Sequence, residues 1–357
     1  MIKICKKCLL TSHVQGVIFD DEDVCDLCRK WEKRDVRQQE LERVDREREL
    51  EATLLGSHVG GEYDCILSFS GGKDSCYLLY KLVKEYKLKV LAYTSDFDIP
   101  ANTWDNIRRT IKQLNVDHYV HTPSNEFYRR FIRYLLKNQT KRGAVHTVCY
   151  FWLDIREGDI LRLAMEKNVP LIVTGYSPGQ PDPQRMLYEM PPERIAKEDW
   201  TPHELFESGL FDESERSLFW DPSLYGEDAK FPRIIAPFHA WEYHQADVME
   251  KVVKLGLAKS KWYANPVLSN FTLNWLLMYS DLEKLGYNPY IPEFSQLVRE
   301  GKARRTQWRL LFYLMDWMVR NKVLLGRHVD KSLKWLDLKP EELKIKRGGY
   351  VERFVRL

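Results

Sequence analysis

The feature that most constrains this chain is a glycine turn between a short apolar run and an apolar helical pattern. The run covers residues 63–69, the helical pattern covers 76–83, and the turn reads Ser70-Gly71-Gly72-Lys73-Asp74-Ser75. A strand, a glycine turn and a helix in this order direct backbone N–H groups and a helix N-terminus toward one anion. The sequence therefore predicts a phosphate site, on a loop too short for the Walker pattern.

Apolar runs and helical patterns alternate around this turn, which predicts an α/β fold with a doubly wound parallel sheet. Further strands are expected at 89–94, 117–121 and 169–174, and helices at 104–114, 127–137 and 153–166. Such sheets bind ligands at the carboxyl ends of their strands, so the loops that follow the strands are candidate binding segments. Thr94 and Asp96 follow the second strand and Gly175 follows the fourth. For Thr94 and Asp96, ordinary turn chemistry is the alternative explanation.

Four of the seven cysteines form two Cys-x-x-Cys pairs, Cys5 with Cys8 and Cys25 with Cys28. Two pairs at this separation can place four thiolates around one tetrahedral Zn²⁺, and a short segment with little core needs such a centre in order to fold. Four protein thiolates leave no open position for a substrate, so the predicted zinc is structural. Two unrelated redox or reactive pairs are the alternative.

Composition excludes some classes of protein. The 357 residues carry 55 basic and 52 acidic side chains, a net charge of +3, which does not by itself indicate a polyanionic partner. A nucleic acid partner is therefore not expected, although a local arrangement of basic residues would still allow one. We find neither a membrane-spanning apolar run nor the apolar core of a signal peptide, so we expect a cytoplasmic protein without a membrane partner and with reduced cysteines.

The turn at residues 70–75 resembles the PP-loop of the ATP-pyrophosphatase superfamily, which includes tRNA thiolation enzymes, ammonia-using synthetases and N-acetyl sugar amidotransferases. The four-cysteine segment is most similar to the N-acetyl sugar amidotransferase branch, where such a ribbon precedes the PP-loop. This resemblance implies an enzyme that grips the pyrophosphate of ATP while AMP passes to the substrate, with Lys73 supplying charge and Asp74 holding Mg²⁺. The nucleotide-binding residues it implies are Ser68, Ser70, Gly71, Gly72, Lys73, Asp74, Ser75, Thr94, Asp96 and Gly175.

His146 and Cys149 stand where many superfamily members carry a Cys-x-x-Cys pair, just before the predicted helix at 153–166. Those relatives use the pair, often with a third cysteine, for an iron–sulfur cluster or for sulfur relay. Outside the ribbon this chain has only Cys65, Cys76 and Cys149, so a three-cysteine cluster is hard to assemble. We expect His146 to contact the substrate as a catalytic residue and Cys149 to be a buried thiol. A His146–Cys149 metal pair is the alternative.

The predicted organisation has six segments. They are a zinc ribbon at 1–33, a charged connecting helix at 34–60, the ATP-binding core at 61–185, an insertion or lid at 186–232, a helical region at 233–330 and a basic tail at 331–357. Arg304 and Arg305 either bring positive charge to the predicted ATP site or lie at the end of a solvated helix. The aromatic helix at 308–317 is expected to belong either to the core or to a homodimer surface.

These observations predict an enzyme that adenylates an amide or carboxyl oxygen of a small molecule, after which ammonia displaces AMP. The resemblance implies an N-acetyl sugar, free or nucleotide-linked, as the substrate, and a separate glutaminase subunit as the source of ammonia. Two alternatives stay open. One is sulfur insertion into tRNA or a small molecule, and the other is a non-catalytic scaffold that senses nucleotide.

Overall fold

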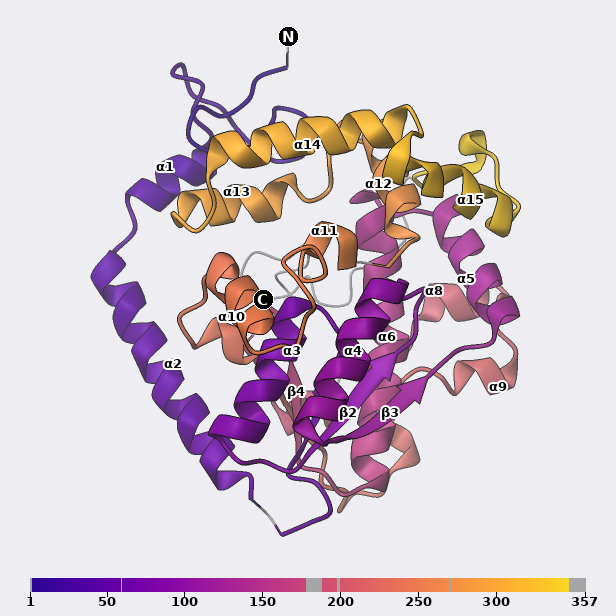
Figure 1. Cartoon of the computed structure of the whole chain (residues 1–357). Coiled ribbons are helices and arrows are strands. Elements are labelled where there is room, and N and C mark those ends of the chain that lie inside the picture. Colours follow the sequence, from indigo (N-terminus) through magenta and orange to yellow (C-terminus); the bar gives the residue numbers. More distant parts are fainter. Residues whose placement is uncertain (1, 59, 178–187, 198–199, 270, 347–357) are drawn as a thin grey trace.

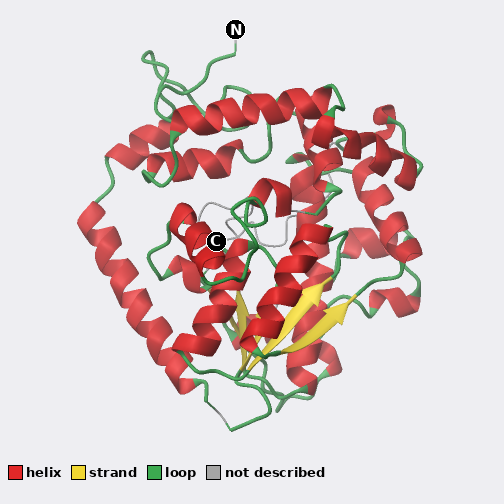
Figure 2. Ribbon diagram, viewed as in Figure 1, coloured by secondary structure: helices red, strands yellow, loops and turns green. Residues whose placement is uncertain are grey.

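The computed structural model describes residues 2–58, 60–177, 188–197, 200–269 and 271–346, and their centre is a six-stranded sheet (Figures 1 and 2). The strands are β1 (Cys65–Ser68), β2 (Val90–Ser95), β3 (Asp117–His121), β4 (Leu171–Thr174), β5 (Glu189–Met190) and β6 (Arg233–Ile235). Their order is β3-β2-β1-β4-β6-β5, and every pair is parallel except β5 with β6. The predicted parallel sheet is therefore confirmed, with one antiparallel strand, β5, added at its edge.

The two faces of the sheet are covered by different helices because successive strand residues point in opposite directions. Ile66 belongs to a hydrophobic cluster that includes Phe131 and Ile160 of α5 (Asn125–Lys137) and α6 (Gly143–Glu166). Its neighbour Leu67 belongs to a second cluster, which draws on α3 (Lys73–Tyr80), α4 (Ala101–Leu114) and α10 (Gln245–Lys254). Helices on both faces make the sheet doubly wound.

Helix α6 begins at Gly143, ten residues earlier than the sequence predicts, so His146 and Cys149 lie inside it. Its first N–H groups are satisfied by a side chain from a distant helix, since Asp281 accepts from the backbone N–H groups of Ala144 and Val145. Gly143 has φ +91°, and a Cβ at this position would lie 2.2 Å from Asp281 Oδ1. No local capping residue marks this start, which explains the error.

The N-terminal segment packs beside the C-terminal helices and then runs down the edge of the molecule (Figure 1). Two antiparallel bridges, Ile4 with Thr11 and Phe19 with Cys25, shape its cysteine-bearing turns. Helix α1 (Asp26–Glu32) follows, and then the long charged helix α2 (Val36–Gly56), which starts where Asp35 accepts from the Gln38 N–H at 2.9 Å. Leu50 and Leu54 attach α2 to the α3–α4–α10 cluster.

Segment 188–232 is described at 188–197 and 200–232, and the second of these parts contacts α5 and α6. It contains β5 and the short helices α7 (Pro192–Lys197), α8 (His203–Glu207) and α9 (Glu213–Arg216). Arg162 of α6 donates to the carbonyls of Ser217 and Leu218 at 2.8 and 3.1 Å. A Cβ on Gly158 would lie 2.7 Å from the Leu218 carbonyl oxygen, so this glycine permits the close contact. The chain then re-enters the sheet as β6, inside the region for which the sequence predicts helices.

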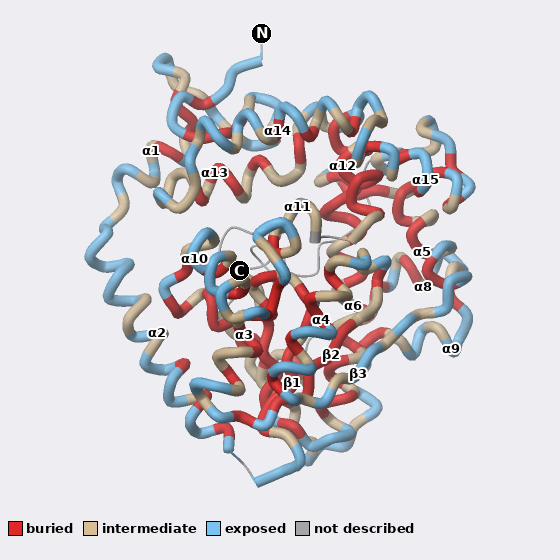
Figure 3. The backbone as a smooth tube through the Cα atoms, in the orientation of Figure 1, coloured by how far each residue is buried: buried red, intermediate tan, exposed pale blue. Residues whose placement is uncertain are grey.

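The C-terminal helices close the carboxyl edge of the sheet, with α13 and α14 crossing above it in Figure 1. They are α11 (Pro266–Ser269), α12 (Asn274–Lys284), α13 (Ile291–Arg299), α14 (Arg305–Arg320) and α15 (Arg327–Leu336). Their buried side chains join the α5–α6 cluster, so they share one core with the sheet. Figure 3 shows this continuous buried interior.

Helix α14 has two different sides. Its inner side contributes Phe312 and Met315 to the core, whereas Leu310, Tyr313 and Trp317 are exposed. The exposed outer side is compatible with the predicted homodimer contact, which stays a prediction. Among the described residues, no helix is both long enough and apolar enough to cross a membrane.

Candidate active site

The glycine turn joins β1 to α3 at the carboxyl edge of the sheet, at the point where the chain order reverses between β1 and β4. Gly71 has φ +73°, and a Cβ there would lie 2.4 Å from Ile107 Cγ1 on α4, so this position admits only glycine. Gly72 has an ordinary extended backbone with φ −71°, and its Cβ position is in contact only with the Ser70 hydroxyl, at 3.5 Å. Gly71 is thus required by the fold, whereas Gly72 leaves open space above the backbone.

The hydroxyl groups of the turn fix its shape. Ser75 Oγ donates to the Gly72 carbonyl at 3.1 Å, and Ser70 Oγ lies 3.2 Å from Ser75 Oγ. The Cys76 N–H makes the first bond of the helix, to the Gly72 carbonyl at 3.0 Å. The first backbone N–H groups of α3 have no partner within the helix, so they are free of helical hydrogen bonds where the sequence predicts an anion site, which stays a prediction.

Lys73 and Asp74 form a compact cluster with Tyr243, which comes from just before α10. Lys73 Nζ lies 2.5 Å from Asp74 Oδ2 and 3.1 Å from the Tyr243 hydroxyl oxygen, and the Tyr243 hydroxyl donates to Asp74 Oδ1 at 2.7 Å. Only 4% of Lys73 is exposed. Burial, with Asp74 beside it, raises the pKa of Tyr243 well above its usual value, so the phenol keeps its proton and acts as a donor. Sequence reasoning missed Tyr243, for which no motif gives a signal.

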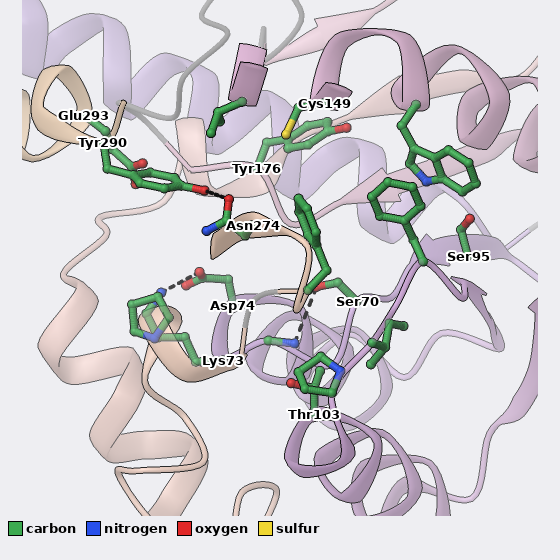
Figure 4. A pocket seen from close by; sticks show the side chains of 18 of the residues that line it. Ser70, Lys73, Asp74, Ser95, Thr103, Cys149, Tyr176, Asn274, Tyr290 and Glu293 are labelled. Carbon is green, nitrogen blue, oxygen red and sulfur yellow. Dashed lines mark hydrogen bonds and ion pairs between the residues drawn. The ribbon is translucent and has the colours of Figure 1, made fainter. Parts of the chain in front are cut away.

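A cavity of about 410 Å³ opens above the turn, and it brings most of the predicted catalytic residues together. Ser68, Ser70, Gly72, Lys73 and Asp74 line one side. Figure 4 shows Lys73, Asp74 and Ser70 below the cavity, with Cys149 and Tyr176 on its opposite side. A volume of this order is typical of a small-molecule site.

Several predicted nucleotide residues do not line the cavity. The Thr94 hydroxyl is buried between strands, where it donates to the Phe69 carbonyl at 2.6 Å and contacts His118 Nε2 at 2.8 Å. The Asp96 N–H donates to the His121 carbonyl, which attaches the loop after β2 to β3. Gly175 lies against the start of α3, with its Cβ position 3.5 Å from Ser75 Cα. The cavity is instead lined by Ser95 at the end of β2 and by Phe97 and Ile99 in the loop that follows, and a nucleotide role for Thr94, Asp96 and Gly175 stays a prediction. The Gly179–Gln180 part of the loop after β4 lies outside the described residues.

His146 and Cys149 both face the cavity from one side of α6, a single helical turn apart. His146 is buried, its Nδ1 lies 3.4 Å from the Thr140 hydroxyl oxygen, and its ring stacks on Tyr150 at 5.5 Å. Cys149 is only half-buried and lines the cavity. The expectation of a buried packing thiol is therefore wrong, because the helix starts earlier than predicted and turns this residue toward the site.

The wall opposite the turn comes from the C-terminal helices. No residue of the described parts of segment 186–232 lines the cavity, and its role as an insertion or a lid stays a prediction. Asn274, Tyr290 and Glu293 supply polar groups on this wall, and sequence reasoning assigned no role to any of them. The Tyr290 hydroxyl donates to Asn274 Oδ1 at 2.7 Å. Burial raises the pKa of the Glu293 carboxyl to about 8, with the charge of Lys73 opposing this effect and that of Asp74 adding to it.

The four predicted ligand cysteines form a group that could hold a metal ion. All four are buried, and their sulfur atoms lie within 4.8 Å of one another. Cys5 Sγ is 3.8 Å from Cys28 Sγ, and Cys8 Sγ is 3.7 Å from Cys25 Sγ. Tetrahedral Zn²⁺ with bonds of about 2.3 Å separates its sulfur ligands by roughly 3.8 Å, so the thiols fit this ion.

The protonation of the cysteine centre depends on whether a cation is bound there. Hydrogen bonds from Cys25 and Cys28 lower the pKa of the Cys8 thiol to about 2. The hydrogen bonds that Cys28 makes with Cys25 and Cys8, together with burial, raise its own pKa. Four crowded thiols therefore resist losing all of their protons unless a positive ion compensates the charge. The ion is not identified by this geometry, and zinc stays the prediction.

The cysteine segment is attached to helices that also line the cavity. Arg305 donates from Nε to the Cys8 carbonyl at 2.8 Å and from Nη2 to the Cys5 carbonyl at 2.7 Å. The Leu9 N–H donates to Ser295 Oγ of α13 at 3.2 Å. Arg305 thus binds the ribbon, which neither of the two expectations for the Arg304–Arg305 pair included.

Comparisons with known proteins give only distant similarities. No family model matches the sequence, and no curated protein matches it. Similar solved structures include the U34-tRNA thiolase NcsA from Methanococcus maripaludis with its [4Fe-4S] cluster, at 12% identity over 100% of this chain and 94% of that one, with a TM-score of 0.37. NMN synthetase from Francisella tularensis is 12% identical over 85% and 97% of the two chains, with a TM-score of 0.35.

An NH3-dependent NAD synthetase from Campylobacter jejuni is 14% identical over 89% of this chain and 100% of that one, with a TM-score of 0.34. All three scores are low. The interpretation of the site therefore depends on its own geometry.

Proposed function

We propose that this protein is an ATP-dependent enzyme that splits ATP between its α- and β-phosphates and adenylates an oxygen of a small substrate. The observation that carries the proposal is the turn between β1 and α3, which opens with Lys73 and Asp74 onto a cavity of about 410 Å³. A helix N-terminus beside a buried lysine suits a leaving group with several negative charges. The opposite wall leaves space for a second substrate.

In this scheme the substrate oxygen attacks the α-phosphorus and the bond to the β-phosphate oxygen breaks, which releases pyrophosphate. The turn holds the departing oxygens through its N–H groups, and Lys73 adds charge. Asp74 already accepts one bond from Lys73 and one from Tyr243, and a carboxylate offers about four lone-pair positions, so it can also hold Mg²⁺. When bound, that ion would neutralise phosphate charge.

We further propose that a nitrogen nucleophile completes the reaction, as in an amidotransferase supplied with ammonia by a glutaminase. Nitrogen attacks the activated carbon, the carbon–oxygen bond to AMP breaks, and the nitrogen loses a proton. The distribution of thiols supports nitrogen over sulfur relay. Cys65 and Cys76 are fully buried, and burial raises the pKa of both, that of Cys76 to about 12. Buried, protonated thiols are poor sulfur carriers.

One observation favours a second function. Cys149 faces the cavity, so a single thiol is available to accept sulfur from a donor enzyme. Thiolation of tRNA or a small molecule therefore remains the second candidate.

The decisive experiment is product analysis with radiolabelled ATP in the presence of Mg²⁺ and a metabolite library. We expect AMP and pyrophosphate, formed only when an acceptor is present. ADP with inorganic phosphate as the products would overturn the proposal. For the nucleophile, Cys149→Ser should keep near-normal turnover with ammonia, whereas complete loss in a folded variant would favour thiolation.

A further inference from the structure

The cavity wall opposite the phosphate turn has the chemistry of a specific acceptor site. This inference rests on the proposed function. Phe294, Trp308 and Phe312 form an aromatic group, with ring centroids 3.6 Å apart for Phe294 and Trp308 and 5.5 Å apart for Phe294 and Phe312. Met278 and Met315 complete the apolar surface. Such a surface binds an apolar or planar body by burying it, without a requirement for charge.

The polar edge of this wall combines a donor with a carboxyl group. Asn274 lies between Tyr290 and Asp74 in Figure 4. Because Asn274 Oδ1 accepts from the Tyr290 hydroxyl, the side-chain NH₂ of Asn274 is the part that can donate. Glu293 lines the same wall, and its carboxyl oxygens are able to accept hydrogen bonds. An amide presents a carbonyl acceptor and an N–H donor together, which is the complement of this pair.

Charge in the cavity argues against anionic acceptors. Among the described lining residues the cations are Lys73 and Arg156, and none lies on the wall from α12, α13 and α14. Lys73 is bound to Asp74, while Arg156 contacts the Tyr176 hydroxyl and lies 3.9 Å from Glu157. The phosphates of ATP already require this positive charge. A second phosphorylated group would enter a wall that offers it a carboxyl group and no cation.

We propose that the acceptor is a neutral amide with an apolar or aromatic body, and that the wall built by α12, α13 and α14 selects it over carboxylates and over nucleotide-linked or polyanionic acceptors. The phosphate turn alone is compatible with either an amide or a carboxyl acceptor, and the opposite wall favours the amide. It also separates the acceptor from nucleotide-linked sugars and from tRNA, which carry several phosphate charges. Above the pKa of about 8 that burial gives Glu293, its side chain is an ionised acceptor, so a carboxylate would place two further acceptors against it, whereas an amide places an N–H there.

Binding without turnover tests this selectivity separately from the proposed function. The probes are indole-3-acetamide, indole-3-acetate and a uridine diphosphate-linked N-acetyl sugar, each titrated at pH 9, where Glu293 is ionised, by saturation-transfer NMR with a non-hydrolysable ATP analogue and Mg²⁺ present. We expect the amide to bind at least about tenfold more tightly than the carboxylate, and the nucleotide sugar to leave the amide signal unchanged. Glu293→Gln keeps the shape of the side chain and should reduce the preference to about twofold or less.

Three results would overturn the inference. They are equal binding of amide and carboxylate to the wild type, displacement of the amide by the nucleotide sugar, and no saturable binding of the amide at its solubility limit. Ser57→Ala, a buried position outside the cavity, serves as the matched control and should keep the wild-type preference. Release of AMP and pyrophosphate with an unrelated acceptor would retain the proposed function while removing this acceptor class.

Discussion

Asp281 gives a prediction whose magnitude follows from the structure. It is fully buried at the start of α6 and accepts from two backbone N–H groups of that helix. Burial raises its pKa from 3.8 to about 7, and the bonds from Val145 and Ala144 only partly oppose the rise. Asp281→Asn keeps a carbonyl oxygen at the helix start and removes the ionisable group. The free energies of unfolding of the two proteins should therefore depend differently on pH.

The sign follows from the proton balance. Below about pH 4 the carboxyl is protonated in both states, so its contribution to folding is fully present. Between pH 4 and 7 the unfolded chain loses the proton while the folded protein keeps it, so the stability of the wild type falls as pH rises. At 1.36 kcal/mol per pH unit, a separation of about 3 units amounts to about 4 kcal/mol. Above pH 7 the difference stays constant. The Asn variant lacks this loss and gains relative stability across the window.

Urea unfolding followed by far-UV circular dichroism between pH 4 and 8 measures this difference. Asp45→Asn, which removes an exposed carboxyl of α2, controls for the change of net charge. A difference between Asp281→Asn and wild type that stays flat over this range would refute the reasoning. Asp281→Ala removes the acceptor as well, so two buried N–H groups lose their partner at about 1–3 kcal/mol each at any pH. The region around His146 should then exchange its amide hydrogens faster.

Three further predictions concern the turn and the ribbon. Protein purified without chelator should contain one zinc per chain by elemental analysis, and Cys5→Ser or Cys25→Ser should lose the metal and unfold the ribbon. Well-folded protein without metal would contradict this prediction. Gly72→Val should fold normally and lose ATP binding in calorimetry, whereas Gly71→Ala should lower the free energy of unfolding by a few kcal/mol because of its positive φ and the contact with α4. Arg305→Ala should retain the metal but speed amide hydrogen exchange in the ribbon, because two hydrogen bonds of about 1.5–3 kcal/mol each are lost. Unchanged exchange would show that Arg305 does not hold the ribbon against α14.

The parts of the fold that the sequence predicts correctly are set by neighbouring residues. The turn at residues 70–75 follows from one strand end and one helix start, and the cysteine group follows from two short spacings. The failures share a different cause. The start of α6 depends on Asp281, which is more than a hundred residues away, and Tyr243 reaches Lys73 across a comparable separation. No local pattern signals contacts of this kind.

The same distinction explains the candidate site. The sequence predicts Lys73 and Asp74 because the residues of a phosphate-binding turn all lie in one short segment. Asn274, Tyr290 and Glu293 lie on the far wall and come from two helices whose local sequences read as ordinary amphipathic patterns. Cys149 was misjudged because its exposure depends on where α6 begins. Residues that bind an invariant cosubstrate are thus easier to find than residues that select the acceptor.

The position of the cysteine segment connects the metal to the acceptor side of the cavity. Its knuckles bind Arg305 at the first turn of α14 and Ser295 on α13. Phe294 and Trp308, which are near these contacts in the sequence, line the cavity on the side where we propose that the acceptor binds. The phosphate turn depends instead on β1, α3 and α4, which the ribbon does not hold. If the four cysteines hold a metal ion, its loss should therefore loosen α13 and α14 and leave the nucleotide side in place, which amide hydrogen exchange of the two regions with and without chelator would measure.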